Sequence, residues 1–194
     1  MTHRMYGMLV VFVFVLLLTG SAQAQVQNPD DGSFFRDPLR PAVPIGDDDD
    51  QGTIGEKIAG AWLGNPAFGL DFDCNGVADT PLGPPASDVQ SFGAGGLWVS
   101  VNPGNPNSGL GTWAKTGNRQ ITGQDIVFIN PSETAPDGLI ARIGIVVDFD
   151  PGFKTASSTF GANLYTPDQD PLVDVPFLCT AGQHTSLRKV NATE

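Results

Sequence analysis

The fold is decided by residues 139–149, which read LIARIGIVVDF. In an extended strand, successive side chains point to opposite faces. Apolar side chains fill one of these faces: Ile143, Ile145, Val147 and Phe149. The other face carries Arg142, Gly144, Val146 and Asp148. Both faces are apolar near the centre. This is expected for a strand of a closed barrel or tight sandwich, with one face inside and the other partly covered.

Short stretches of this kind recur from Ile58 onward, separated by clusters of Gly, Pro, Asn and Asp. We expect eight strands, over residues 58–63, 89–92, 97–101, 109–116, 119–129, 140–149, 155–165 and 176–188. The short connections suit antiparallel neighbours, so an up-and-down meander is the economical topology. The sequence thus predicts an all-β fold: an eight-stranded antiparallel up-and-down barrel that is filled by side chains or holds one small ligand.

The composition argues against several classes of protein. A chain of 194 residues is long enough for one domain. Its 24 Gly and 16 Pro residues, with only 16% charged residues, disfavour a helical bundle. With 10 Lys and Arg against 21 Asp and Glu, the net charge of -11 disfavours nucleic acid as a partner. The two His and two Cys residues lack the spacing of a zinc site.

The N-terminal region predicts export. Arg4 precedes an apolar run over residues 8–18 and small residues that end at Ala24, so we interpret residues 1–24 as a signal peptide. The run is too short for a stable membrane anchor, and we expect a secreted or periplasmic protein. Residues 25–55 are rich in Pro and Asp and predict a disordered acidic linker, which leaves residues 56–190 for the barrel domain.

Export also bears on the two cysteines. An oxidising compartment favours a disulfide between Cys74 and Cys179. Such a bond closes a loop of about 105 residues, worth on the order of 4 kcal/mol in the chain-entropy model. The alternative is that both are small buried side chains that never pair.

Two resemblances support a barrel. The motif Gly60-Ala61-Trp62 and the late basic residue Arg188 resemble the calycin-type barrels of the lipocalin and avidin group. That resemblance implies that Trp62 closes the barrel base, with Arg188 packed on its ring in a cation-π contact. Residues 109–119, 121–129 and 138–142 resemble small secreted barrels related to the allene oxide cyclase-like group. The other lipocalin motifs and the biotin-binding residues of avidins are not apparent, so those ligands do not transfer.

Residues 71–79, DFDCNGVAD, form the sharpest local pattern. Oxygen-bearing side chains at positions 1, 3, 5 and 9, with Gly at position 6, are typical of a calcium loop: Asp71, Asp73, Asn75 and Asp79. Position 12 is Leu82, where an EF-hand places Glu, and the pattern occurs once. The same spacing also fits a polar turn without an ion. Calcium is the one cofactor that the sequence suggests.

The aromatic residues in the predicted strands either fill the core or line a pocket. Our candidate ligand-binding residues are Trp62, Trp113, Phe128, Arg142 and Phe160. Arg142 lies in an apolar strand, where a charge is costly unless it is paired or reaches water. It either neutralises an anionic ligand at the barrel mouth or pairs with Asp125 or Asp148 on a neighbouring strand.

No catalytic motif is apparent, and we interpret His184 as an exposed histidine near the end of the last strand. The leading hypothesis is a secreted barrel that binds a small, mostly apolar molecule. One alternative is an isomerase or cyclase of the allene oxide cyclase-like type, with Arg142 and pocket aromatics steering a polyene or polyketide. Another is a structural surface protein with a calcium-stiffened loop. The sequence leaves oligomeric state open.

Overall fold

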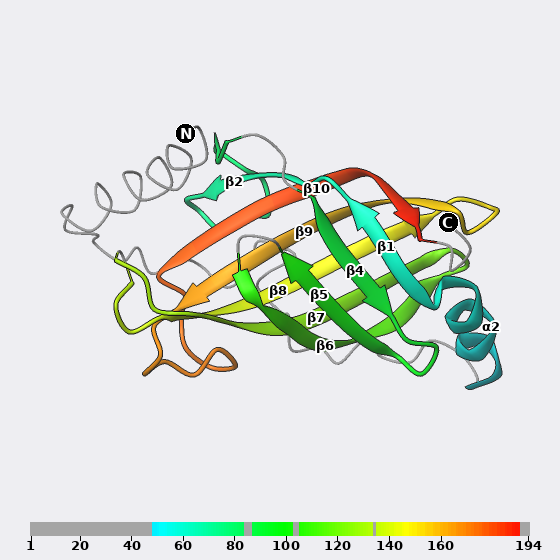
Figure 1. The fold of residues 1–194 in the computed structure, drawn as a ribbon, viewed down its shortest axis with the longest axis horizontal. Coiled ribbons are helices and arrows are strands. Elements are labelled where there is room, and N and C mark those ends of the chain that lie inside the picture. The colour runs from blue at the N-terminus through cyan, green and yellow to red at the C-terminus, as the bar shows by residue number, and fades with distance from the viewer. Residues whose placement is uncertain (1–47, 84–86, 103–104, 134, 191–194) are drawn as a thin grey trace.

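The computed structural model describes residues 48–83, 87–102, 105–133 and 135–190 (Figure 1). The predicted signal peptide and residues 25–47 of the predicted linker lie outside the described residues. Within the described part of the chain, no helix is long and apolar enough to cross a membrane.

The described chain forms one helix and one antiparallel sheet. The helix is α2, Asp48–Ile58. The strands are β1 Gly60–Gly64, β2 Ala67–Asp71, β3 Thr80–Pro81, β4 Asp88–Phe92, β5 Leu97–Asn102, β6 Asn105–Gly117, β7 Gln120–Ile129, β8 Leu139–Phe149, β9 Thr155–Tyr165 and β10 Leu178–Lys189. The sheet order is β1-β4-β5-β6-β7-β8-β9-β10-β2-β3, and β1 also pairs with β10. The predicted eight-stranded antiparallel barrel is therefore confirmed, with β1 and β4 to β10 as its staves.

The seam of the barrel is short. β1 pairs with β4 along all of its five residues, but with β10 only from Trp62 to Gly64. The chain then turns through residues 65–66 into β2, which pairs with the other half of β10. The sequence missed β2 because a five-residue segment containing Gly, next to the acidic loop, shows little alternation. Its partner on β10 supplies the hydrogen bonds that make it a strand.

α2 closes one end of the barrel (Figure 1). Ile54 is 3% exposed and Ile58 is 0% exposed, and both belong to the main core. The indole Nε1 of Trp62 donates to the carbonyl of Ile58 at 2.8 Å. α2 extends into residues 48–55, which were assigned to the predicted linker. Ile58 was expected to begin a strand; that expectation is wrong, because Ile58 ends the helix. The acidic sequence shows no strong amphipathic stripe, and tertiary packing on Trp62 holds the helix.

The main core fills the lumen below α2. It contains Ile54, Ile58, Trp62, Phe92, Trp98, Trp113, Ile121, Ile145, Val147, Phe149, Ala156 and Leu187. Trp62 packs edge-on against Phe149, with ring centroids 5.1 Å apart. The cation over the Trp62 ring is Lys189, at 5.9 Å, and not Arg188 as the resemblance implied. Lys189 pairs with Trp62 across the seam, whereas Arg188 has the opposite parity and is exposed.

The predicted disulfide is confirmed. Cys74 and Cys179 are bonded and lie 105 residues apart in the chain. The bond ties the acidic loop after β2 to the start of β10, next to the residue pair Cys179 and Asp71. A disulfide of this kind indicates an oxidising environment.

Candidate functional site

The middle of the lumen is the candidate site. Strand pairing places Gly111, Asp125, Ile143, Ala162 and Thr180 in one row, on the face that also carries the core. Ile143, Ala162 and Thr180 point inward and yet remain partly exposed. The lumen is therefore not completely filled at this level.

Two apolar clusters enclose this level. The main core lies on the side of α2, and a second cluster of Val127, Ala141 and Leu164 lies beyond it, with Ile143 packed against both. Phe160, in the row next to Ala162, is also inward and partly exposed. The walls at this level are thus mainly apolar, with a few polar side chains among them, as is usual in small-molecule sites.

Asp125 is a buried carboxylate in this wall. Asp125 is 2% exposed, and the Ser100 hydroxyl donates a hydrogen bond to its Oδ2. The other oxygen, Oδ1, is buried and has no hydrogen-bond partner among the described residues. Burial raises the pKa of Asp125 to about 6, and the Ser100 hydrogen bond opposes part of that rise.

Glycines make room for this carboxylate. A Cβ at Gly109 would overlap Asp125 Oδ2 and Ser100 Oγ, and a Cβ at Gly111 would overlap the backbone of residues 124 and 125. The two glycines of the GLG segment, residues 109–111, therefore let β7 approach β6 closely enough to bury Asp125 in the wall.

A second polar group links the strands on either side of the seam. His184 Nε2 lies 2.9 Å from Asp88 Oδ2, and His184 Nδ1 lies 2.7 Å from Ser158 Oγ. Gln90 donates to the same Asp88 oxygen at 2.8 Å, and Trp98 Nε1 donates to Gln90 Oε1 at 2.8 Å. This chain of side chains therefore runs from β9 through β10 to β4 and β5.

The Ser158–His184–Asp88 chain has the residue types of a catalytic triad, but it lies within the packed wall. Ser158 is 4% exposed, His184 2% and Asp88 7%. The ring of His184 is packed so closely on Gly64 that a Cβ there would come within 2.6 Å of it. We therefore assign the chain to barrel closure.

The sequence missed this group, because His184 was expected to be exposed; that expectation is wrong. Strand alternation could have indicated that both side chains point inward. His184 has the same strand parity as Thr180 and Gly182, and Ser158 has the same parity as Phe160. Nothing in the spacing of positions 88, 158 and 184 links them before the barrel is closed.

The predicted ligand-binding residues divide into three groups. Trp62 and Trp113 are core side chains, 0% and 3% exposed. Phe160 faces the lumen, with its ring centroid 5.1 Å from that of His184. Phe128 is 63% exposed on the outer face, so its predicted place in the pocket is wrong.

Arg142 also lies on the outer face, because it pairs with Ile126 between the inward residues Ala141 and Ile143. Its guanidinium donates to Gln124 Oε1 and to the carbonyl of Pro171, both at 3.1 Å. Asp125 faces the lumen instead, and Asp148 accepts from Gln120 at 2.9 Å. The predicted place of Arg142 at a ligand in the lumen is therefore wrong.

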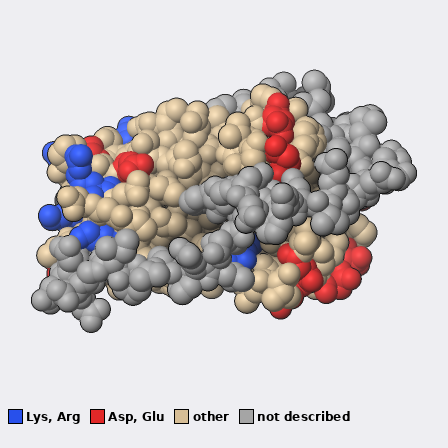
Figure 2. All heavy atoms as spheres, turned by 180° about the vertical axis from the view of Figure 1, so that it is seen from behind, with Lys and Arg blue, Asp and Glu red and all other residues tan. Residues whose placement is uncertain are grey.

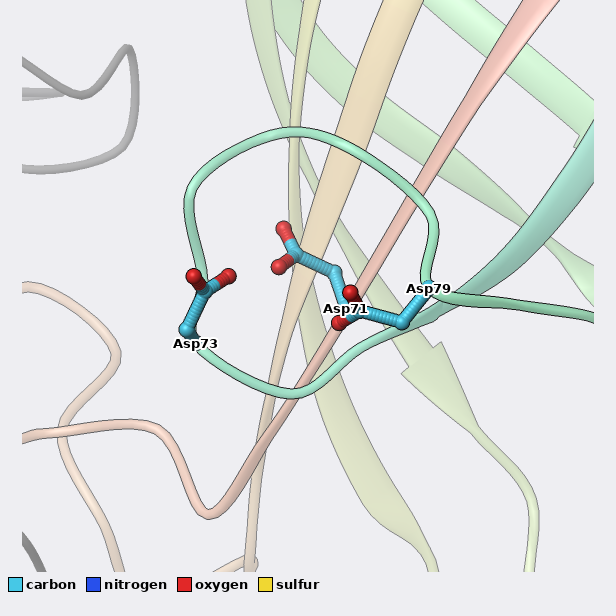
Figure 3. A group of neighbouring side chains, drawn as sticks. All are labelled: Asp71, Asp73 and Asp79. Carbon is cyan, nitrogen blue, oxygen red and sulfur yellow. The ribbon is translucent and has the colours of Figure 1, made fainter.

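The acidic loop gathers three of its four predicted ligands. Asp71, Asp73 and Asp79 each place an oxygen within 4.8 Å of the others (Figure 3). Asn75 turns into the loop, where its Nδ2 donates to Asp73 and its Oδ1 accepts from the backbone of Val77.

Asp71 is the centre around which this loop folds. It is 0% exposed, and its carboxylate accepts from the backbone N–H of Asn75 at 3.0 Å and of Gly76 at 2.7 Å. Burial raises the pKa of Asp71, and these two hydrogen bonds oppose the rise. The turn itself uses positive φ angles of 56° at Cys74 and 88° at Gly76.

Comparisons with known proteins found no match to a family model, a curated protein or a solved structure. The closed eight-stranded barrel agrees with the calycin-like fold suggested by the sequence.

Replacing His184 tests the closure of the seam. We expect His184→Ala to lower the free energy of unfolding by about 2–4 kcal/mol, because it leaves a cavity and removes a partner from buried Asp88. Urea denaturation measures the change. The matched control is Thr185→Ala, an exposed neighbour on β10, which should stay within about 0.5 kcal/mol of wild type. Equal stabilities of the two variants would contradict this role.

Asp125 makes stability depend on pH. Its folded pKa of about 6 lies above the ordinary 3.8, so the folded state binds the proton more tightly than the unfolded state. The contribution of Asp125 to stability is therefore largest below about pH 4 and falls by about 3 kcal/mol as the pH rises through 6. In urea denaturation from pH 4 to 7.5, Asp125→Asn should remove this fall, whereas Asp148→Asn, an exposed control, should retain it. An unchanged profile for Asp125→Asn would exclude Asp125 as its source.

Proposed function

We propose that this protein is a secreted binding module that holds a small, mostly apolar molecule in the middle of its barrel. The observation that carries the proposal is the partial exposure of inward-facing side chains between two apolar clusters. Side chains that pointed into a filled barrel would be buried there, as Ile121 and Val147 are nearer to α2.

The chemistry of the wall supports a mostly apolar ligand. Ile143, Phe160 and Ala162 offer apolar contact, and burying such surface contributes about 25 cal/mol per Å². Ser100 and Thr180 are polar side chains on the same inward surface, and both remain partly exposed. A few polar groups among apolar walls orient a ligand rather than supply most of its affinity.

The two ends of the barrel differ, which favours one entry. α2 covers the end at the main core, whereas the loops 130–138 and 166–177 lie at the other end (Figure 1). We propose that the ligand enters between these loops. Secretion is supported by the Cys74–Cys179 disulfide and by the predicted signal peptide.

Weak calcium binding at the acidic loop is a separate proposal. It is supported by the grouping of Asp71, Asp73 and Asp79, whose hard oxygens suit calcium. With three carboxylates gathered and the amide oxygen of Asn75 in use, we propose a dissociation constant of about 10⁻⁴ to 10⁻³ M. The ion would stiffen the loop next to the disulfide.

Filling the lumen should abolish ligand binding. In Ala162→Phe, the new ring would occupy the space beside Ile143 and Thr180, so we expect at least a tenfold loss of affinity for the neutral fluorescent probe N-phenyl-1-naphthylamine. The control is Ala114→Phe, which adds the same ring on the outer face of β6 and should bind the probe as wild type does. Circular dichroism checks that both variants fold. Absence of probe binding by wild type, or equal binding by both variants, would contradict the proposal.

Calcium should raise thermal stability through the acidic loop. At a calcium concentration of ten times the dissociation constant, binding stabilises the folded state by about 1.4 kcal/mol. We expect a corresponding rise in Tm for wild type and none for Asp73→Asn/Asp79→Asn, whose side chains are exposed. Asp168→Asn/Asp174→Asn, in the loop 166–177, is the control. A wild-type Tm that is insensitive to about 10 mM calcium would reduce the loop to a polar turn.

A further inference from the structure

We propose that the ligand of the lumen is a mostly apolar amine, recognised as a cation by the Ser100–Asp125 pair. This inference rests on the proposed function and names the chemical class of its ligand.

The Ser100–Asp125 pair offers only acceptors to a ligand. Ser100 commits its hydroxyl hydrogen to Asp125 Oδ2, so its Oγ keeps lone pairs alone for a further partner. Asp125 Oδ1 lacks a donor within the described part of the chain. Ser100 is inward and partly exposed, whereas Asp125 is buried, so a ligand meets the hydroxyl oxygen first. A molecule bound here therefore has to bring an N–H or O–H group.

The remaining buried polar groups of the lumen already have partners. Asp88 is bonded to His184 and Gln90, Gln90 also accepts from Trp98, and Ser158 is bonded to His184. Among the buried side-chain atoms of the described residues, Asp125 Oδ1 is the one without a partner. The buried acceptor that lacks a donor therefore lies beside Ser100.

Charge favours a cation over a neutral donor. An ionised carboxylate in a wall of low polarity is costly until an opposite charge or several donors approach it. An ammonium group supplies both charge and donors, and charge-assisted hydrogen bonds are roughly twice as strong as neutral ones. An alcohol of the same shape supplies a single neutral hydrogen bond, and a carboxylate is repelled.

Acidic side chains gather at one end of the barrel, whereas most of the basic side chains lie at the other end, among further acidic ones (Figure 2). Acidic residues gather in the loops at the proposed entry: Asp71, Asp73, Asp79, Glu133, Asp137, Asp168, Asp170 and Asp174. These loops contain no Lys or Arg. Basic residues gather at the end closed by α2: Lys57, Lys115, Arg119, Lys154, Arg188 and Lys189. This end also carries Glu56, Asp148, Asp150 and the three Asp residues that begin α2, so it is close to neutral whereas the entry is acidic. Such a distribution draws cations toward the entry and repels anions.

Three probes that differ in one group test the inference: 1-naphthylmethylamine, 1-naphthalenemethanol and 1-naphthaleneacetate. Each is titrated against N-phenyl-1-naphthylamine bound to the full mature chain at pH 7.4. For wild type we expect the amine to displace the dye at a concentration at least tenfold lower than the alcohol, and the acetate to be the weakest of the three.

Asp125→Asn should reduce the preference for the amine over the alcohol to threefold or less. Asp148→Asn, the same substitution on the outer face, should retain the full preference. Dye binding and circular dichroism show that each variant is folded and has an open lumen.

Failure of the inference and failure of the proposed function give different results. Equal displacement by amine and alcohol in wild type, or an unchanged preference in Asp125→Asn, overturns the inference and leaves the binding function intact. If wild type binds neither the dye nor the alcohol, the proposed function itself is wrong, and the inference falls with it.

Discussion

Three residue pairs between β1 and β10 close the barrel, and the rest of the structure depends on that short seam. Beyond Gly64, the chain leaves β4 and continues along β10 as β2. Backbone hydrogen bonds therefore connect β4 to β10 only through the short strand β1. The His184–Asp88 contact bridges the same two strands from inside, at 2.9 Å. Gly64 makes this possible, because the imidazole packs on the space where a Cβ would stand.

The closed barrel is organised in layers along its axis. α2 and the main core, with Trp62 at its centre, occupy one end. A level with buried polar side chains follows, where Asp125 and the His184 chain lie among apolar neighbours. The cluster around Val127 and Leu164 lies beyond it. Partial exposure at the polar level, combined with an unpartnered carboxylate oxygen there, is the reason that we propose this level as the ligand site.

The outer surface contributes to the same argument. One end of the barrel carries the acidic loops, whereas basic and acidic residues are mixed at the other end, so the field along the barrel axis has a direction. Arg142, which the sequence suggested as an anion-binding group, is on the outer face and bonded to Gln124 and Pro171. The inward charge beside the proposed site is the carboxylate of Asp125, which is why we propose a cationic ligand.

Alternation and turn residues determined most of the fold locally. The pattern of residues 139–149 placed Ile143, Ile145, Val147 and Phe149 on the inner face, where they lie, because strand parity is a local property. The pairing of Cys74 with Cys179 followed from composition and the expected compartment, since the chain has two cysteines.

Only the tertiary structure decided the site. Residues 88, 158 and 184 meet because β4, β9 and β10 lie around one lumen, and Asp125 is a functional candidate because its second oxygen finds no donor there. The helical state of residues 48–58 likewise comes from packing on Trp62. Burial and the partners of a polar group are properties of the closed barrel as a whole, so local sequence patterns cannot specify them.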